Sequence, residues 1–83
     1  MEFSIVQFGS NALSDLRKLQ QSLQFAGHHV SIESGQTASD SHSLISKTAC
    51  NLVCIAGEWT SERASLQILM FNMNVDKSIF IIP

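Results

Sequence analysis

Short apolar runs alternate along the chain with longer segments in which apolar residues recur every three or four positions. The runs are rich in β-branched and aromatic residues, which predicts strands, and they span residues 3–8, 29–33, 51–56 and 78–82. The longer segments have the spacing of helices with one apolar side, and they span residues 13–26, 39–48 and 61–72. The predicted order is βαβαβαβ, which indicates a parallel sheet.

The patterns of the individual strands predict their places in this sheet. Residues 51–56 form a continuous apolar run, as in a central strand buried on both faces, whereas residues 29–33 alternate like a half-buried edge strand. Right-handed crossovers then favour the strand order 2-1-3-4, with strands numbered along the chain. We expect one three-layer α/β domain over residues 1–83, Rossmann-like or flavodoxin-like, with the first helix on one face of the sheet and the other two on the opposite face.

The helix boundaries leave several choices open. Ser39 or Asp40 can cap the second helix, and Thr60 or the serine that follows it can cap the third. In the first helix the apolar stripe includes either Leu19 or Gln20.

Composition and charge restrict the class of protein. Hydrophobic residues make up 45% of the 83 residues and charged residues 14%, which is typical of a folded domain rather than a disordered chain. Five basic and seven acidic residues give a formal net charge of -2, and without a basic stripe we expect no nucleic-acid binding. No apolar run approaches the ~18 residues of a membrane span, and the beginning of the chain does not resemble a signal peptide. We therefore expect a soluble, cytoplasmic protein.

Ligands of parallel sheets bind outside the carboxyl ends of the strands, where the strand order reverses. In this chain the loops after the first and third strands meet at that point. The candidate ligand-binding residues in these loops are Gly9, Ser10, Asn11, Gly57, Glu58, Trp59 and Ser61. No GxGxxG dinucleotide motif and no GxxxxGK[ST] phosphate loop is present. Trp59 either stacks on a bound base or sugar or packs over the second helix or a subunit boundary.

Cysteine and histidine suggest no metal or redox chemistry. Cys50 and Cys54 are four residues apart, ~13 Å along a strand, which is too far for a disulfide. We expect both to be reduced thiols in the core. The three histidines lack identifiable companion ligands, so neither a metal nor a cofactor is expected.

The segment from Ala49 to Gln67 resembles the nucleoside 2-deoxyribosyltransferase-like family, most closely its short phage- and bacteria-associated members of unknown function. The resemblance rests on Gly57, Trp59, Ser61 and Ala64, and on the Phe25-Ala26-Gly27-His28-His29-Val30 turn. It implies the α/β fold and a nucleoside pocket. In the family's enzymes a glutamate carries the glycosyl group, and the matching position here is Gln67, whose neutral amide is a far poorer nucleophile. The resemblance therefore implies the pocket without the reaction, and Gln67 is a further candidate ligand-binding residue.

Two further positions depart from the family pattern. Asn51 stands where the family prefers aspartate, and Arg63 where it prefers a small residue. We expect Arg63 either to meet a phosphate or a partner's carboxylate or to be a solvated residue of the first helical turn.

The third helix and last strand are more apolar than a single core contact requires. The apolar residues of this helix span more than the ~100° of one core stripe, and the strand is apolar throughout 79–82 without a fourth helix to cover it. We expect a homodimer or a protein partner here. The interface candidates are Leu69, Met70, Phe71, Met73 and Phe80. As an alternative, the two methionines fill gaps in a small core.

These features favour a non-catalytic interaction protein, phage-encoded or accessory, that self-associates or binds a partner protein through the third helix. A nucleoside- or nucleotide-binding domain is the alternative. A third reading is an active glycosyltransferase or hydrolase that uses Glu58 or Glu62 as an unusual base.

Overall fold

The computed structural model describes residues 1–9, 13–72 and 77–82. In these ranges strands and helices alternate as the sequence predicts. The strands are β1 (Glu2–Phe8), β2 (His29–Ser34), β3 (Leu52–Gly57) and β4 (Ser78–Ile81). The helices are α1 (Leu13–Phe25), α2 (Ala38–Lys47) and α3 (Ser61–Asn72).

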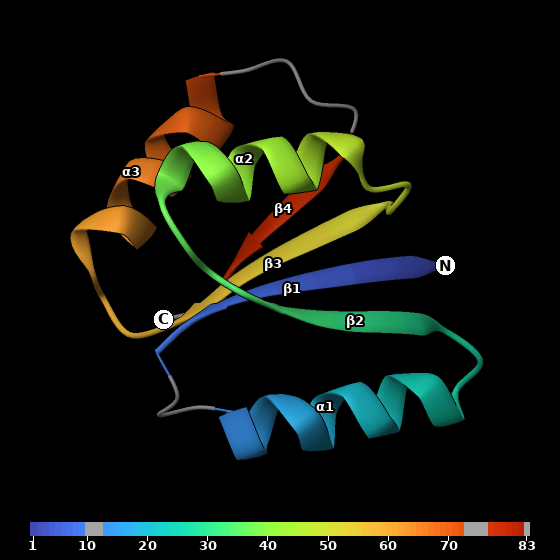
Figure 1. Cartoon of the computed structure of the whole chain (residues 1–83). Coiled ribbons are helices and arrows are strands. Elements are labelled where there is room, and N and C mark those ends of the chain that lie inside the picture. Colours follow the sequence, from blue (N-terminus) through green and yellow to red (C-terminus); the bar gives the residue numbers. More distant parts are fainter. Residues whose placement is uncertain (10–12, 73–76, 83) are drawn as a thin grey trace.

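The strands form one parallel sheet in the order β2-β1-β3-β4, which confirms the predicted topology. Figure 1 shows α1 on one face of this sheet and α2 and α3 together on the other. The prediction of a central third strand is also confirmed, because every residue of Val53–Ala56 is buried. The molecule is thus a small three-layer α/β domain.

Two apolar cores lie on the two faces of the sheet, because successive strand residues point to opposite sides. Val6 packs on the side of α2 and α3 with residues such as Ile45 and Leu66. Its neighbour Ile5 packs under α1 with Leu16. The side chains of β1 therefore supply both cores.

The cysteines follow the same division. Cys50 belongs to the core beneath α2 and α3, and Cys54 to the core beneath α1. Both are buried free thiols, as predicted. Burial raises the pKa of the Cys54 thiol above its ordinary value.

The N-cap of α2 differs from the predicted residues, and the N-cap of α3 is one of the two predicted residues. The N-cap of α2 is Thr37, whose hydroxyl accepts a hydrogen bond from the backbone N–H of Asp40 over 3.1 Å, so the prediction of Ser39 or Asp40 as the cap is wrong. Several residues before α2 have side chains that can cap a helix. Thr37 is the cap because its backbone is extended, as an N-cap requires, and the helix begins directly after it. Thr60 caps α3 by accepting from the N–H of Arg63, which confirms one of the two predicted caps.

The apolar stripe of α1 contains Gln20 rather than Leu19. The Gln20 side-chain Nε2 donates to the carbonyl oxygen of Val30 over 2.8 Å, whereas Leu19 is exposed. Gln20 thereby attaches α1 to β2 at one backbone group of the strand.

Candidate functional site

The carboxyl ends of β1 and β3 lie side by side, with Phe8 paired to Gly57. Gly57 has a φ of +98°, and a Cβ on it would overlap the backbone of Phe8. Only glycine fits there, because the backbone torsion and the available space both exclude a side chain. The N–H of Glu58 then donates to the Phe8 carbonyl over 2.7 Å. The loop after β3 is therefore held directly against the end of β1.

The Glu58 side chain fills the space above this junction. A Cβ on Gly9 would overlap the side-chain carbons of Glu58, so the acidic side chain lies against the Gly9 backbone. Gln7 is buried and donates from its side-chain Nε2 to the Gly9 carbonyl. Glu58 thus lies at the carboxyl ends of β1 and β3, the edge at which parallel sheets bind ligands. The candidates Ser10 and Asn11 lie outside the described residues.

Arg63, from the first turn of α3, is the largest fully buried side chain, with an exposed fraction of 0%. Its guanidinium donates to the carbonyl oxygens of Gly57 and Ile82, and its Nε donates to Oε1 of Gln67 over 3.0 Å. These bonds join the ends of β3 and β4 to α3. Burial lowers the pKa of the Arg63 guanidinium, but arginine remains protonated in proteins.

Both predictions for Arg63 are therefore wrong. The side chain is not solvated, and it is enclosed rather than open to a phosphate or to a partner's carboxylate. Its acceptors are backbone carbonyls from two strand ends that are distant in the sequence.

Trp59 covers the buried guanidinium. The Cζ atom of Arg63 lies 3.9 Å from the centroid of the Trp59 ring, in a cation–π arrangement. The tryptophan remains largely exposed. Its structural partner is therefore the arginine of α3, where the sequence had suggested α2 or a subunit boundary.

The remaining ligand-binding candidates are spread along α3. Ser61 is exposed at the first position of the helix, and Gln67 is half-buried one turn beyond Arg63. The oxygen of Gln67 is engaged by Arg63. Gln67 thus serves as a hydrogen-bond acceptor for the buried Arg63 side chain.

The interface candidates occupy different environments. Phe71 and Phe80 have exposed fractions of 68% and 57%, whereas Met70 is buried in the core. Leu69 is half-buried and packs against that core. Met73 lies outside the described residues. Sequence reasoning did not single out Ile68, which is also exposed, although its helical spacing from Phe71 was visible.

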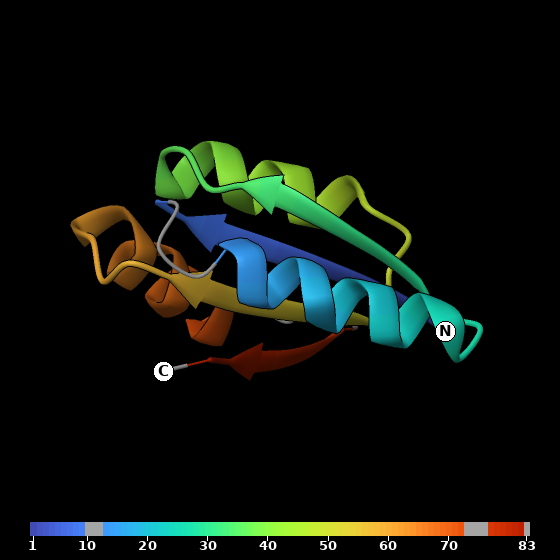
Figure 2. The ribbon, with the colours of Figure 1, turned by 90° about the horizontal axis from the view of Figure 1, so that it is seen from below.

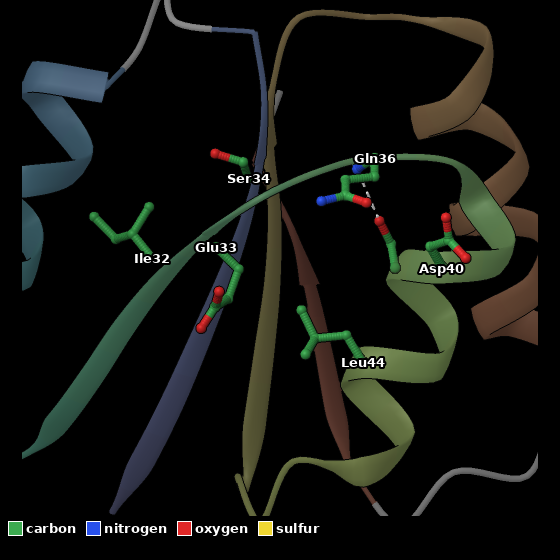
Figure 3. Close-up of a pocket in the computed structure, with 7 residues that line it drawn as sticks. Ile32, Glu33, Ser34, Gln36, Asp40 and Leu44 are labelled. Atoms are coloured by element: carbon green, nitrogen blue, oxygen red, sulfur yellow. Dashed lines mark hydrogen bonds between the residues drawn. The ribbon is translucent and has the colours of Figure 1, made fainter.

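A pocket of about 500 Å³ lies between the end of β2 and the start of α2. Figure 3 shows Glu33 and Ser34 on its strand side and Asp40 and Leu44 on its helix side. Sequence reasoning missed it, because Glu33 and Asp40 looked isolated in the sequence. The only available signal was that Glu33 directly precedes the polar tract of residues 34–43 and Asp40 lies within it.

Residues 1–9, 13–72 and 77–82 lack two other kinds of feature. No three histidine, cysteine, aspartate or glutamate side chains come together there in a way that could hold a metal ion. None of the helices in these ranges is long and apolar enough to cross a membrane.

Comparison of the chain with models of protein families, with curated proteins and with solved structures finds no match. The fold and site define a small parallel α/β domain in which Glu58 packs against Gly9 at the carboxyl ends of β1 and β3.

Proposed function

We propose that this chain is a non-catalytic interaction protein that self-associates through the free edge of β4 and the adjoining side of α3. The observation that carries the proposal is the presence of large exposed apolar side chains on both faces of this edge. Phe71 on α3 has an exposed fraction of 68%, and Phe80 on β4 has one of 57%. Exposed apolar surface of this kind is typical of interfaces between proteins.

The exposed side of α3 is directed away from α2. Glu62 marks the side that faces α2, because its carboxylate accepts a hydrogen bond from the N–H of Ala38 at the start of that helix. Phe71 follows nine residues later, about two and a half turns, and so lies on about the opposite side of α3. Since α2 and α3 lie side by side on one face of the sheet (Figure 1), this opposite side adjoins the edge formed by β4.

Phe80 lies on the other face of the same edge. It is paired in register with Cys54, which belongs to the core under α1. Figure 2, seen from the α1 side, shows that α1 does not extend over β4. A large aromatic ring therefore stays uncovered beside that core.

The outer edge of β4 has no partner strand in the described part of the chain. Natural proteins often protect such edges with lysine, but Lys77 donates from Nζ to the carbonyl oxygens of Thr48 and Cys50, over 2.7 and 3.2 Å. The strand Ser78–Ile81 itself carries no charge. Its backbone is thus available for pairing.

A second copy is the occupant that fits these features best. Antiparallel pairing of two β4 strands about a two-fold axis would continue the sheet across both molecules. The same operation would place the two α3 helices side by side on one face and the two Phe80 rings near each other on the opposite face. One symmetric contact would thereby cover Phe71, Phe80 and the free edge of β4.

Light scattering after size-exclusion chromatography tests this proposal. We expect a dimer for the native chain and a monomer for Phe71→Glu. Phe25→Glu is the matched control, because Phe25 is 96% exposed at the end of α1, and it should remain a dimer. A native monomer at high protein concentration, or equal dissociation by both variants, would contradict the proposal.

The resemblance to the nucleoside 2-deoxyribosyltransferase-like family, with its phage-associated members, supports nucleoside or nucleotide binding as a second candidate function. The specific observation in its favour is the exposed indole of Trp59 in the loop after β3. Thermal denaturation with nucleosides and deoxynucleotides tests it, since a ligand that binds the folded state raises its stability. A rise in Tm that disappears in Trp59→Ala would favour this candidate, and no rise at millimolar ligand would oppose it.

A further inference from the structure

We propose that the free edge of β2 binds an extended peptide segment, which adds to the sheet as a further strand and places an arginine side chain in the pocket between β2 and α2. This surface lies at the opposite edge of the sheet from β4. The inference is therefore independent of the proposed self-association.

The backbone of β2 beside the pocket has free hydrogen-bonding groups. The N–H groups of His29 and Gly35 donate to β1 carbonyls, at Met1 and Gln7. Because bonding alternates along a parallel strand, the backbone groups of Ile32 and Ser34 point away from β1. Strand addition to such an edge is a common mode of peptide recognition.

Only one part of this edge is open. Gln20 of α1 donates to the carbonyl oxygen of Val30 and thus occupies the outward-facing group nearer the start of the strand. Ile32 and Ser34 follow, and both line the pocket. The open backbone and the pocket consequently coincide at the end of β2.

The acidic side chains of the pocket favour a positively charged occupant. Glu33 from β2 and Asp40 from α2 both line it, and no lysine, arginine or histidine does. A guanidinium group can pair with carboxylates through two parallel hydrogen bonds, which favours arginine over lysine. This charge complementarity selects a basic segment as the occupant.

The pocket also suits the aliphatic part of an arginine. Leu44 supplies apolar lining (Figure 3), and arginine commonly lays its methylene groups along apolar surface while its charged head meets polar groups. The Ile32 side chain packs on the opposite face of β2, under α1. The volume of about 500 Å³ leaves room for the whole side chain.

The turn that shapes the pocket is fixed by internal hydrogen bonds. The N–H of Gly35 donates to the Gln7 carbonyl over 2.7 Å, and the N–H of Gln36 donates to the hydroxyl of Ser41 over 3.1 Å. Ser41 is itself buried. A pocket that is already formed costs less to fill than one that must be ordered on binding.

Fluorescence anisotropy with a labelled peptide, Thr-Ser-Val-Arg-Val-Ser-Thr, tests the proposal on the full chain. We expect saturable binding that is weakened roughly tenfold when citrulline, which has the shape of arginine without its charge, replaces the arginine. A peptide with N-methylated backbone amides flanking the arginine should also bind poorly, because it cannot pair with a strand. Equal binding of the citrulline peptide would overturn the proposal, and equal binding of the N-methylated peptide would overturn strand addition.

Variants of the protein locate the site. Glu33→Gln with Asp40→Asn should weaken binding of the arginine peptide by roughly tenfold or more, whereas Asp15→Asn, a loss of charge on the exposed surface of α1, should leave it unchanged. Amide NMR shifts on addition of the peptide should centre on Ile32 and Ser34. Shifts centred on β4, or an equal loss in Asp15→Asn, would contradict this location. Binding of free arginine amide as tight as that of the peptide would indicate a small-cation site in place of the peptide site.

Discussion

Arg63 donates from Nε to Oε1 of Gln67 over 3.0 Å, and the arginine that makes this bond is completely buried. The two residues are one helical turn apart on α3. The bond directs the only acceptor atom of the Gln67 side chain toward the interior of the fold. Gln67 therefore helps Arg63 to stabilise the junction of α3 with the ends of β3 and β4.

Substitution of Arg63 should strongly destabilise the protein. Arg63→Met removes the donors to the Gly57 and Ile82 carbonyls, and unsatisfied buried polar groups cost about 1–3 kcal/mol each. We expect a loss of about 3 kcal/mol in the free energy of unfolding, measured by urea denaturation. Arg17→Met, at an exposed position of α1, is the control and should change it by less than about 0.5 kcal/mol. Similar values for the two variants would refute the structural role of Arg63.

Introduction of a glutamate at position 67, as in the nucleoside 2-deoxyribosyltransferase-like enzymes, should not produce catalysis. In Gln67→Glu the new carboxylate would accept the same hydrogen bond from Arg63 with added charge. The nearby guanidinium would lower the basicity of this carboxylate, and with it its nucleophilicity, and would hold its oxygen toward the strand ends. We expect no release of base from deoxynucleosides, as followed by chromatography, in either the native protein or the variant. Release by the variant alone would show that the position still faces a working pocket.

Two glycines with nearly the same backbone torsion provide a test of the junction between β1 and β3. Gly57 and Gly27 have φ values of +98° and +94°. A Cβ on Gly57 would overlap Phe8, but nothing lies within 4 Å of one on Gly27. Gly27→Ala should therefore lose about 1–2 kcal/mol for the left-handed torsion alone, and Gly57→Ala considerably more. Equal losses in denaturant titrations would show that Gly57 is required only for its torsion.

The buried Cys54 thiol should make stability depend on alkaline pH. Its pKa is raised in the folded state, so the unfolded chain loses this proton first. The contribution of Cys54 to the free energy of unfolding is therefore complete below about pH 8.5, where an exposed thiol begins to ionise. This contribution is lost as the pH rises toward the folded-state pKa of the thiol. Urea denaturation from pH 7 to pH 10 should show this fall, and Cys54→Ala should reduce its slope. An unchanged slope in Cys54→Ala would assign the fall to other groups.

Sequence patterns predicted the fold well because the fold depends on local periodicity and handedness. The apolar run at 51–56 identified the central strand, and the alternation at 29–33 identified an edge. The choice between Leu19 and Gln20 was beyond pattern analysis, since the glutamine faces the sheet by bonding a backbone carbonyl of β2. Hydrophobic periodicity cannot identify a polar side chain that faces the sheet because it hydrogen-bonds to the main chain.

The candidate site was harder to predict for a related reason. Arg63 looks like an exposed residue of a first helical turn, and its acceptors include the carbonyl of Ile82, which is distant in the sequence. The pocket between Glu33 and Asp40 likewise depends on the return of α2 across the sheet. Such contacts arise from tertiary structure, and the spacing of residues along the sequence does not reveal them.

Hydrogen exchange at the outer edge of β4 tests the central claim of self-association most directly. The N–H groups of Ser78 and Ile82 donate to β3, so by alternation those of Ile79 and Ile81 point outward. We predict that the Ile79 and Ile81 amides exchange slowly in concentrated solution, and much faster on dilution or in Phe71→Glu. Exchange of these two amides as fast as that of Ile32 on the free edge of β2, at every protein concentration, would contradict pairing of two β4 strands.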